Sequence, residues 1–242
     1  MLFRSLFELT LWPAIGLASQ GLLTLFLHLE AEMSAFILIG TVGMSTMQVC
    51  QLDVAYALLF DMWSKSVKHQ FLAPIRGTHL VLGAGLMGMG RGLVVFVLMV
   101  LFSLWGFGVP LLQPGLAPVL LFLLGLFLNG LLVGTLVCTL ILFWGPRAEV
   151  AAWSAVSVVF VLSGVYYPVS LLPSPLDLIA RLIPLTHILE AFRAPFGFPG
   201  SPGMSFALGL GLSLLYCAAS LVLLERALTA ARRTGTLLRL SE

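Results

Sequence analysis

The apolar positions of this chain fall into long unbroken runs, and its polar positions gather between them. A helix crosses a bilayer with about 20 mostly apolar residues, whereas a membrane β-strand needs about ten and alternates in polarity. Because these runs are long and do not alternate, they predict helices. The windows that qualify as spanning helices are 9–29, 35–60, 81–109, 116–143, 149–172 and 203–226. The predicted fold is an all-α polytopic membrane protein, with six transmembrane helices in one domain over residues 1–242.

The basic residues give these windows an orientation. With the N-terminus inside, nine Lys and Arg residues fall in cytoplasmic parts, and only Arg181 and Arg193 fall outside. Short cytoplasmic loops of membrane proteins are enriched in Lys and Arg. We therefore expect a multi-pass protein of the cytoplasmic (inner) membrane with both termini cytoplasmic. The nine cytoplasmic residues are Arg4, Lys65, Lys68, Arg76, Arg147, Arg226, Arg232, Arg233 and Arg239.

The cytoplasmic connection after the second window predicts a short amphipathic helix. Its apolar residues Trp63, Val67 and Phe71 recur at helical spacing, while Lys65 and Lys68 fall on other faces. The helix should end near residue 74, because that residue is a proline and the residue before a proline avoids helical angles.

The external connection from residue 166 to residue 202 is divided by seven prolines. The breaks predict two short helices, 175–183 and 185–194, each too short to span a bilayer. We expect them to enter the outer leaflet and return. Glu190 lies three residues from both His187 and Arg193, a spacing at which it could pair with either on one helix face.

Composition narrows the function classes. Hydrophobic residues make up 60% of the chain and charged residues only 9%, against about 25% charged in a soluble domain. These values exclude a soluble globule, a disordered chain and a nucleic-acid binder, so the expected surroundings are a lipid bilayer and no nucleic acid is an expected partner. The sequence has no phosphate-binding loop and no metal-ligand motif, so we expect no cofactor on this chain. It also offers no catalytic set, so it is not expected to be an enzyme.

Polar residues within the apolar windows have two readings. Burying them in lipid is costly unless they face protein or water. Gln48, Gln51 and Asn129 could therefore form interhelical hydrogen bonds or line a substrate path. Asp53 and Arg91 could pair with each other. The tyrosines at 166 and 167 could form part of an interfacial aromatic belt or flank an exit.

Several stretches resemble the type-2 ABC transporter permeases, the membrane subunits of ABC exporters. One is the run 162–173 (LSGVYYPVSLLP), followed by Ile183-Pro184-Leu185-Thr186-His187 and Glu190-Ala191-Phe192-Arg193. Another is the cytoplasmic segment from Phe60-Asp61-Met62-Trp63 to Leu72-Ala73-Pro74-Ile75-Arg76. The resemblance covers nearly the whole chain in segment count, order and orientation.

The resemblance implies a role for each segment. Residues 61–76 would be the coupling helix that rests in a groove of a separate nucleotide-binding (ATPase) subunit, and residues 170–194 would be a re-entrant helix pair below the external gate. The family works with two permeases and two ATPases, so a second copy of this chain is expected, with ATP and Mg on the partner ATPase subunit. The expected coupling residues are Asp61, Trp63, Lys65, Lys68, Phe71 and Arg76. The candidate path or gate residues are Gln48, Gln51, Asn129, Tyr166, Tyr167, His187 and Glu190.

The function expected from these observations is that of the permease subunit of an ATP-driven ABC exporter. Its substrate would be amphipathic: a lipid-like, glycan or drug-like molecule moved outward. The alternative is a secondary transporter or a membrane assembly protein with no ATPase partner. Single-chain secondary carriers commonly show two related halves, and this sequence has no internal repeat.

Overall fold

The computed structural model describes residues 14–19, 22, 31–63, 76–145 and 148–234. Every regular element within those ranges is helical, which confirms the all-α prediction. The named elements are α2 (Ala31–Trp63), α4 (Gly77–Phe107), α5 (Leu116–Trp144), α6 (Ala148–Leu162), η1 (Val169–Leu171), α7 (Leu176–Leu182), α8 (Pro184–Arg193), η2 (Ala194–Phe196) and α9 (Pro202–Thr234).

Four of the described helices are long and apolar enough to cross a bilayer. Their candidate spans are Glu32–Phe60, Gly77–Phe107, Leu116–Trp144 and Pro202–Arg232. They match the second, third, fourth and sixth predicted windows, and α4 and α9 extend several residues beyond one predicted end. The first window, 9–29, lies largely outside the described residues.

The fifth predicted window, 149–172, is wrong at its second boundary. Helix α6 has 15 residues and ends at Leu162. Gly164 then takes a left-handed backbone conformation with φ +70°, where a Cβ would lie 2.7 Å from the Cγ2 atom of Val169 and 2.9 Å from the Tyr167 carbonyl oxygen. A left-handed residue stops a helix, so the apolar run continues past 162 as a turn and the short helix η1.

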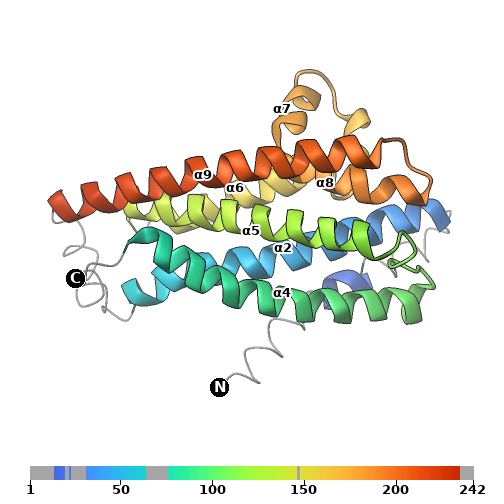
Figure 1. Ribbon diagram of the computed structural model, residues 1–242, viewed down its shortest axis with the longest axis horizontal. Coiled ribbons are helices and arrows are strands. Elements are labelled where there is room, and N and C mark those ends of the chain that lie inside the picture. Colours follow the sequence, from blue (N-terminus) through green and yellow to red (C-terminus); the bar gives the residue numbers. More distant parts are fainter. Residues whose placement is uncertain (1–13, 20–21, 23–30, 64–75, 146–147, 235–242) are drawn as a thin grey trace.

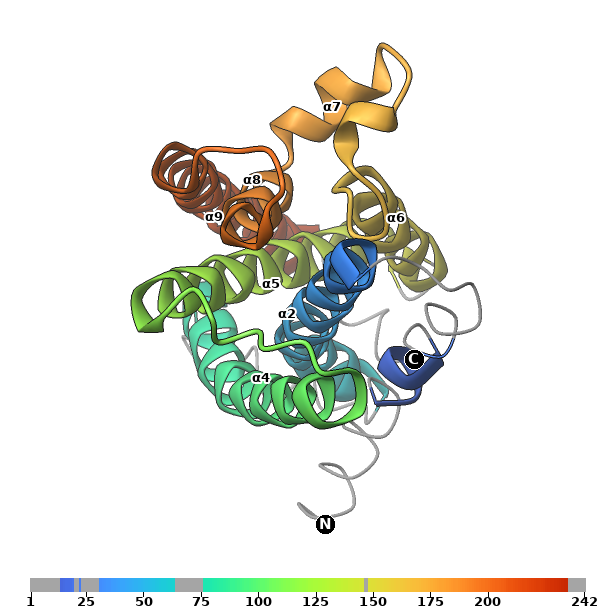
Figure 2. The same ribbon diagram turned by 90° about the vertical axis from the view of Figure 1, so that its right-hand side faces the viewer.

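Helix α2 is the central element, and it packs on α4 and α5 (Figures 1 and 2). Glycines on the neighbouring helices allow this close approach. A Cβ on Gly88 of α4 would lie 3.0 Å from the Cα atom of Cys50, and a Cβ on Gly130 of α5 would lie 2.9 Å from the Met47 carbonyl oxygen. A Cβ on Gly134 of α5 would likewise lie 2.9 Å from the Gln51 carbonyl oxygen. Glycine at these positions therefore sets the helix separation in the core.

Helices α5, α8 and α9 form the other side of the bundle, where α9 packs on both α5 and α8 (Figure 2). The short helix α7 projects away from the long helices, and its leucines Leu178 and Leu182 are each about 60% exposed (Figure 1). The predicted short helices 175–183 and 185–194 thus exist as α7 and α8, within a residue or two of the predicted bounds.

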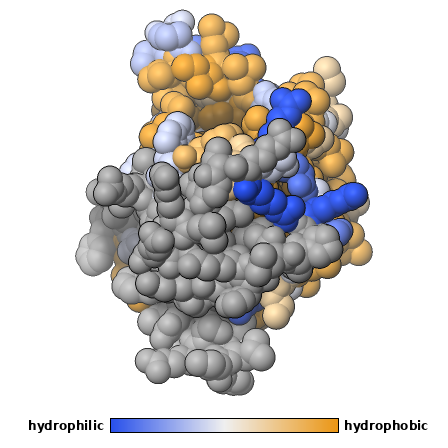
Figure 3. Space-filling view, turned by 90° about the vertical axis from the view of Figure 1, so that its left-hand side faces the viewer, coloured by the Kyte–Doolittle hydropathy of each residue, from blue (hydrophilic) through white to orange (hydrophobic). Residues whose placement is uncertain are grey.

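The bundle has two ends, which are named here by the elements found at each. At the C-terminal end, α2 and α9 finish and α4 begins; at the α8 end, α2 begins and α8 lies beside the start of α9 (Figure 1). Viewed from the C-terminal end, a few hydrophilic residues are visible beside the region drawn in grey, and the described residues around it are mostly apolar (Figure 3). Apolar flanks are expected of a protein whose sides contact lipid.

Candidate functional site

A charged pair lies within the spanning helices. The Arg91 Nη1 atom of α4 donates a hydrogen bond of 2.8 Å to Oδ1 of Asp53 on α2. The side chains are 23% and 12% exposed, respectively. This hydrogen bond confirms the predicted interaction between the two residues. Pairing lowers the cost of holding charge in an apolar environment.

Gln51 is the predicted path residue whose polar atoms have no partner. Its side chain is fully buried on α2, and neither the amide nitrogen nor the amide oxygen forms a hydrogen bond with any described residue. Within the same part of the chain, Asp53 Oδ2 and Arg91 Nε are also buried and unpaired. Gln48, one turn earlier, is partly exposed. A buried polar group without a partner costs about 1–3 kcal/mol, so each of these atoms would gain from a hydrogen-bond partner. Arg193 Nε and Asp177 Oδ1 are buried and unpaired in the same way among the described residues.

Asn129 forms an interhelical hydrogen bond, one of the two roles that the sequence allowed for it. Its Nδ2 donates to the Gly125 carbonyl oxygen at 2.8 Å and to the Ser213 hydroxyl at 3.0 Å. The Ser213 hydroxyl in turn donates to the Gly209 carbonyl at 2.7 Å. This chain of bonds joins α5 to α9 and occupies both amide hydrogens of Asn129.

The most connected charged residue is Arg193, the last residue of α8. Its Nη1 donates to the Gly164 carbonyl oxygen at 2.7 Å, and its Nη2 donates to the carbonyl oxygens of Val165 at 2.7 Å and Phe36 at 3.1 Å. The guanidinium carbon lies 3.5 Å from the centroid of the Phe36 ring. One side chain therefore ties α8 to α2 and to the turn after α6; we call this set the Arg193 cluster, made of Arg193, Phe36, Gly40, Gly164 and Val165.

The sequence supports this cluster with a small residue and an aromatic stack. A Cβ on Gly40 of α2 would overlap the Val165 carbonyl oxygen and would lie 2.5 Å from Arg193 Nη2. Only glycine therefore fits at that position. On the other face of α8, the ring of Phe192 stacks on Phe122 of α5 with centroids 4.1 Å apart.

Arg193 is 2% exposed. Burial lowers the pKa of Arg193 to about 9, and the negative charge of Glu190 acts in the opposite direction. The group is thus cationic at neutral pH, and its charge is solvated by carbonyl dipoles and the Phe36 ring in place of water.

The spacing of Glu190 allowed it to pair with His187 or with Arg193, and the structure shows where the Arg193 and His187 side chains lie instead. Glu190 and Arg193 form no ion pair within 4.0 Å in the described part of the chain, because the guanidinium points to the three carbonyls instead. His187 is likewise occupied elsewhere: its Nε2 is 2.8 Å from the Arg181 carbonyl oxygen. It therefore ties α8 back to α7.

The two tyrosines at the α8 end lie on the turn after α6. The Tyr166 hydroxyl is 3.2 Å from the sulfur of Met44 on α2, whereas the Tyr167 hydroxyl donates to the Val161 carbonyl oxygen at 2.7 Å. Tyr166 thus faces the bundle beside the Arg193 cluster.

The predicted coupling segment falls mostly outside the described residues. This applies to Lys65, Lys68 and Phe71, while Asp61 and Trp63 form the last turn of α2 and only their backbone is described. Arg76 is described: it is exposed and extended, with φ −86° and ψ 150°, and it immediately precedes α4.

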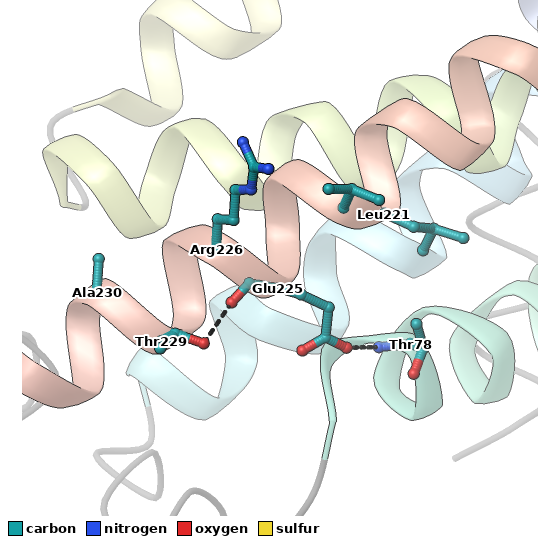
Figure 4. Close-up of a pocket in the computed structure, with 7 residues that line it drawn as sticks. Thr78, Leu221, Glu225, Arg226, Thr229 and Ala230 are labelled. Carbon is teal, nitrogen blue, oxygen red and sulfur yellow. Dashed lines mark hydrogen bonds between the residues drawn. The ribbon is translucent and has the colours of Figure 1, made fainter.

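A groove of about 650 Å³ lies at the C-terminal end, between α9 and the start of α4 (Figure 4). At its edge the carboxylate oxygen Oε1 of Glu225 accepts a 3.0 Å hydrogen bond from the backbone N–H of Thr78 (Figure 4). The residues lining the groove are Thr78, Leu221, Val222, Glu225, Arg226, Thr229 and Ala230.

The sequence did not predict two long-range polar contacts of the described residues: the bonds from Arg193 to backbone carbonyls, and the bond from Thr78 to Glu225. A signal existed for each. Arg193 is one of only two basic residues on the predicted outer side, and Glu225 is the single acidic residue between Pro202 and Thr234. Neither signal identifies the partner residue, because Phe36 lies 157 residues from Arg193 and Thr78 lies 147 residues from Glu225 in the sequence.

Comparison with known protein families matches residues 3–196 to the family described as ABC-2 type transporter. The matched range contains the Asp53–Arg91 pair, the predicted coupling segment and the Arg193 cluster. No curated protein matches the chain.

Proposed function

The chain belongs to the ABC-2 type transporter family, and from this premise we propose that it is the permease subunit of an ATP-driven ABC exporter. The substrate class that we propose is amphipathic: a lipid-like, glycan or drug-like molecule moved outward across the cytoplasmic membrane. The observation that carries the proposal is the family match over residues 3–196, and the four spanning-length helices agree with it.

The proposed topology has six spans and both termini in the cytoplasm. The described bundle contributes four spans, and we assign the remaining two to residues 9–29 and to α6 with the apolar turn that follows it. The excess of Lys and Arg at the C-terminal end supports a cytoplasmic location for that end. We propose that α7 and α8 form a re-entrant pair at the outer side. This placement is supported by their lengths of 7 and 10 residues, each too short to span.

The proposed partners are a separate ATPase subunit and a second copy of this chain. Residues 61–76 would be the coupling helix, with Trp63 and Phe71 filling an apolar groove of the ATPase. Lys65, Lys68 and Arg76 would meet its acidic rim, and Asp61 would begin the segment. The ATPase subunit would bind ATP and Mg, and its closure would move the coupling helix.

The proposed substrate path runs beside Gln48 and Gln51 toward the α8 end. Gln51 is its best-supported member, because its buried amide atoms have no partner among the described residues. Tyr166, Tyr167, His187 and Glu190 would border the exit. The hydrogen bonds of Asn129 favour a packing role for that residue.

Co-purification tests the proposal. The tagged chain is expressed in its native host, extracted in mild detergent, and its associated proteins are identified together with their ATP hydrolysis. We expect a stoichiometric phosphate-loop ATPase that is lost when Trp63 and Phe71 are both changed to Ala. A matched control changes Phe102 and Trp105, which are 40% and 82% exposed near the far end of α4, and should keep the ATPase. A chain that purifies alone, without ATPase activity, would overturn the proposal and favour a secondary transporter or an assembly protein.

A further inference from the structure

The beginning of α4 lacks a cap of its own. The first turn of a helix leaves backbone N–H groups without intrahelical partners, and a side chain just before the helix commonly accepts from one of them. Here the preceding residue is Arg76, which makes no capping hydrogen bond. The acceptor comes instead from α9, where Glu225 Oε1 binds the Thr78 N–H at 3.0 Å (Figure 4).

The contact is built on a close approach of the two helices. Gly77, the first residue of α4, is buried, and a Cβ there would lie 3.1 Å from Leu224 Cδ2 and 3.5 Å from Glu225 Oε1. Leu224 itself is 1% exposed. Figure 4 shows the Glu225 side chain reaching toward Thr78, while Arg226 points away from it. The carboxylate therefore faces the positive end of the α4 dipole without a competing cation from Arg226.

The position of this contact gives it mechanical importance. Thr78 lies two residues after the predicted coupling segment 61–76, and α4 begins directly after that segment. Elsewhere α4 packs chiefly on α2, whereas α9 packs chiefly on α5 and α8. The Glu225–Thr78 bond thus joins helices that otherwise share few contacts, and α8, which carries the Arg193 cluster, packs on α9.

From these contacts we infer that Glu225 is a positioning residue that makes α9 follow the coupling segment. Movement of residues 61–76 reaches α4 through the backbone, passes to α9 through the Glu225–Thr78 bond, and reaches α8 through the α8–α9 packing. The inference rests on the proposed function, since it needs an ATPase to move the segment.

The experiment measures movement of the far end of α9 in the complete complex with its co-purified ATPase. Spin labels are placed at Gly203→Cys, where a Cβ would meet no atom within 4 Å, and at Leu116→Cys, which is 74% exposed. Labelled chains are mixed with unlabelled chains that carry a different tag, so that each purified complex contains a single labelled copy. The wild-type chain is labelled in the same way to correct for signal from the native cysteines. The label distance is compared before and after trapping with ATP and vanadate.

Glu225→Ala should remove most of the ATP-dependent change in label distance, because the bond that joins α4 to α9 is lost. ATP hydrolysis should stay within about twofold of wild type, as for a substitution outside the ATPase interface. Glu225→Gln keeps an acceptor oxygen and should restore most of the movement. Arg226→Ala, on the next residue of the same groove, is the matched control and should behave as wild type.

Thr78→Pro removes the donor from the other side of the same bond. Proline is tolerated in the first helical turn because the N–H there has no intrahelical partner. If the bond transmits the movement, the double variant should lose no more than either single variant. Thr78→Pro also decides the outcome if Glu225→Ala does not assemble. Normal α9 movement in either assembled variant would overturn the inference, whereas a wild-type chain without an ATPase would overturn the proposed function instead.

Discussion

Replacing Arg193 with Met should be among the most damaging single changes in the described bundle. Met has a similar length but no donors, so the carbonyl oxygens of Gly164, Val165 and Phe36 would lose their partner in a buried site. The turn after α6 would lose its attachment to α2, and α8 would lose its attachment to both.

The magnitude follows from the contacts. Three hydrogen bonds from a charged donor contribute about 1.5–3 kcal/mol each, and the stacked Phe36 ring adds about 1 kcal/mol. The cost of burying the guanidinium, several kcal/mol, offsets part of this. We expect a net loss of about 3–5 kcal/mol, the value typical of removing one side of a buried charged network. At about 2–4 °C per kcal/mol for a chain of this size, the apparent Tm should fall by about 6–20 °C.

The assay is thermal unfolding in detergent, followed by tryptophan fluorescence and by the fraction that stays monodisperse after heating. Arg193→Lys should lose about half as much stability as Arg193→Met. A single ammonium group cannot reach carbonyl oxygens on two elements as the forked guanidinium does. Arg181→Met makes the same chemical change on the exposed face of α7 and serves as the control. An R193M protein that unfolds within about 2 °C of this control would refute the reasoning, since the expected loss of about 3–5 kcal/mol should shift Tm by at least about 6 °C.

Three further outcomes follow from the same contacts, each measured as a Tm shift. Gly40→Ala should destabilise through the Val165 carbonyl, and combining it with R193M should cost less than the sum of the two, because both break one cluster. Arg91→Met should cost about 3–5 kcal/mol, while the double change D53N/R91M should cost less, because it leaves no unpaired charge; a larger loss in the double would contradict this. Gln51→Leu should leave Tm unchanged or raise it, since it removes two unpaired buried atoms, yet it should slow transport; a large fall in Tm would show that the amide has a structural partner.

The local parts of the site were predictable from the sequence. The short helices α7 and α8 follow from the prolines around them, and the Asp53–Arg91 pair follows from the rule that charges in lipid require partners. The fifth window was extended too far because hydropathy does not register backbone conformation: residues 163–172 are mostly apolar, yet Gly164 has φ +70° and turns the chain.

The partners of Arg193 could not be predicted for a different reason. Spacing along a helix shows which side chains of that helix can contact each other. It gives no information about the hydrogen-bond acceptors on neighbouring elements. The carbonyl oxygens of Gly164 and Val165 accept no hydrogen bond within a regular helix. Donating to these oxygens is therefore more favourable for Arg193 than pairing with the partly exposed carboxylate of Glu190. An intrahelical ion pair at a surface is worth only about 0.5 kcal/mol.

The amino-acid sequence specifies four long apolar helices, the two short helices that follow α6, the positions of the basic residues and the family to which the chain belongs. These properties depend on residue type and on spacings of a few residues. The tertiary structure alone decided that α2 lies between the glycine faces of α4 and α5, that Arg193 reaches Phe36, and that Glu225 reaches Thr78. Those contacts depend on the rotation and register of helices that are far apart in the chain. Packing of the whole bundle fixes both quantities together, and no local pattern specifies them.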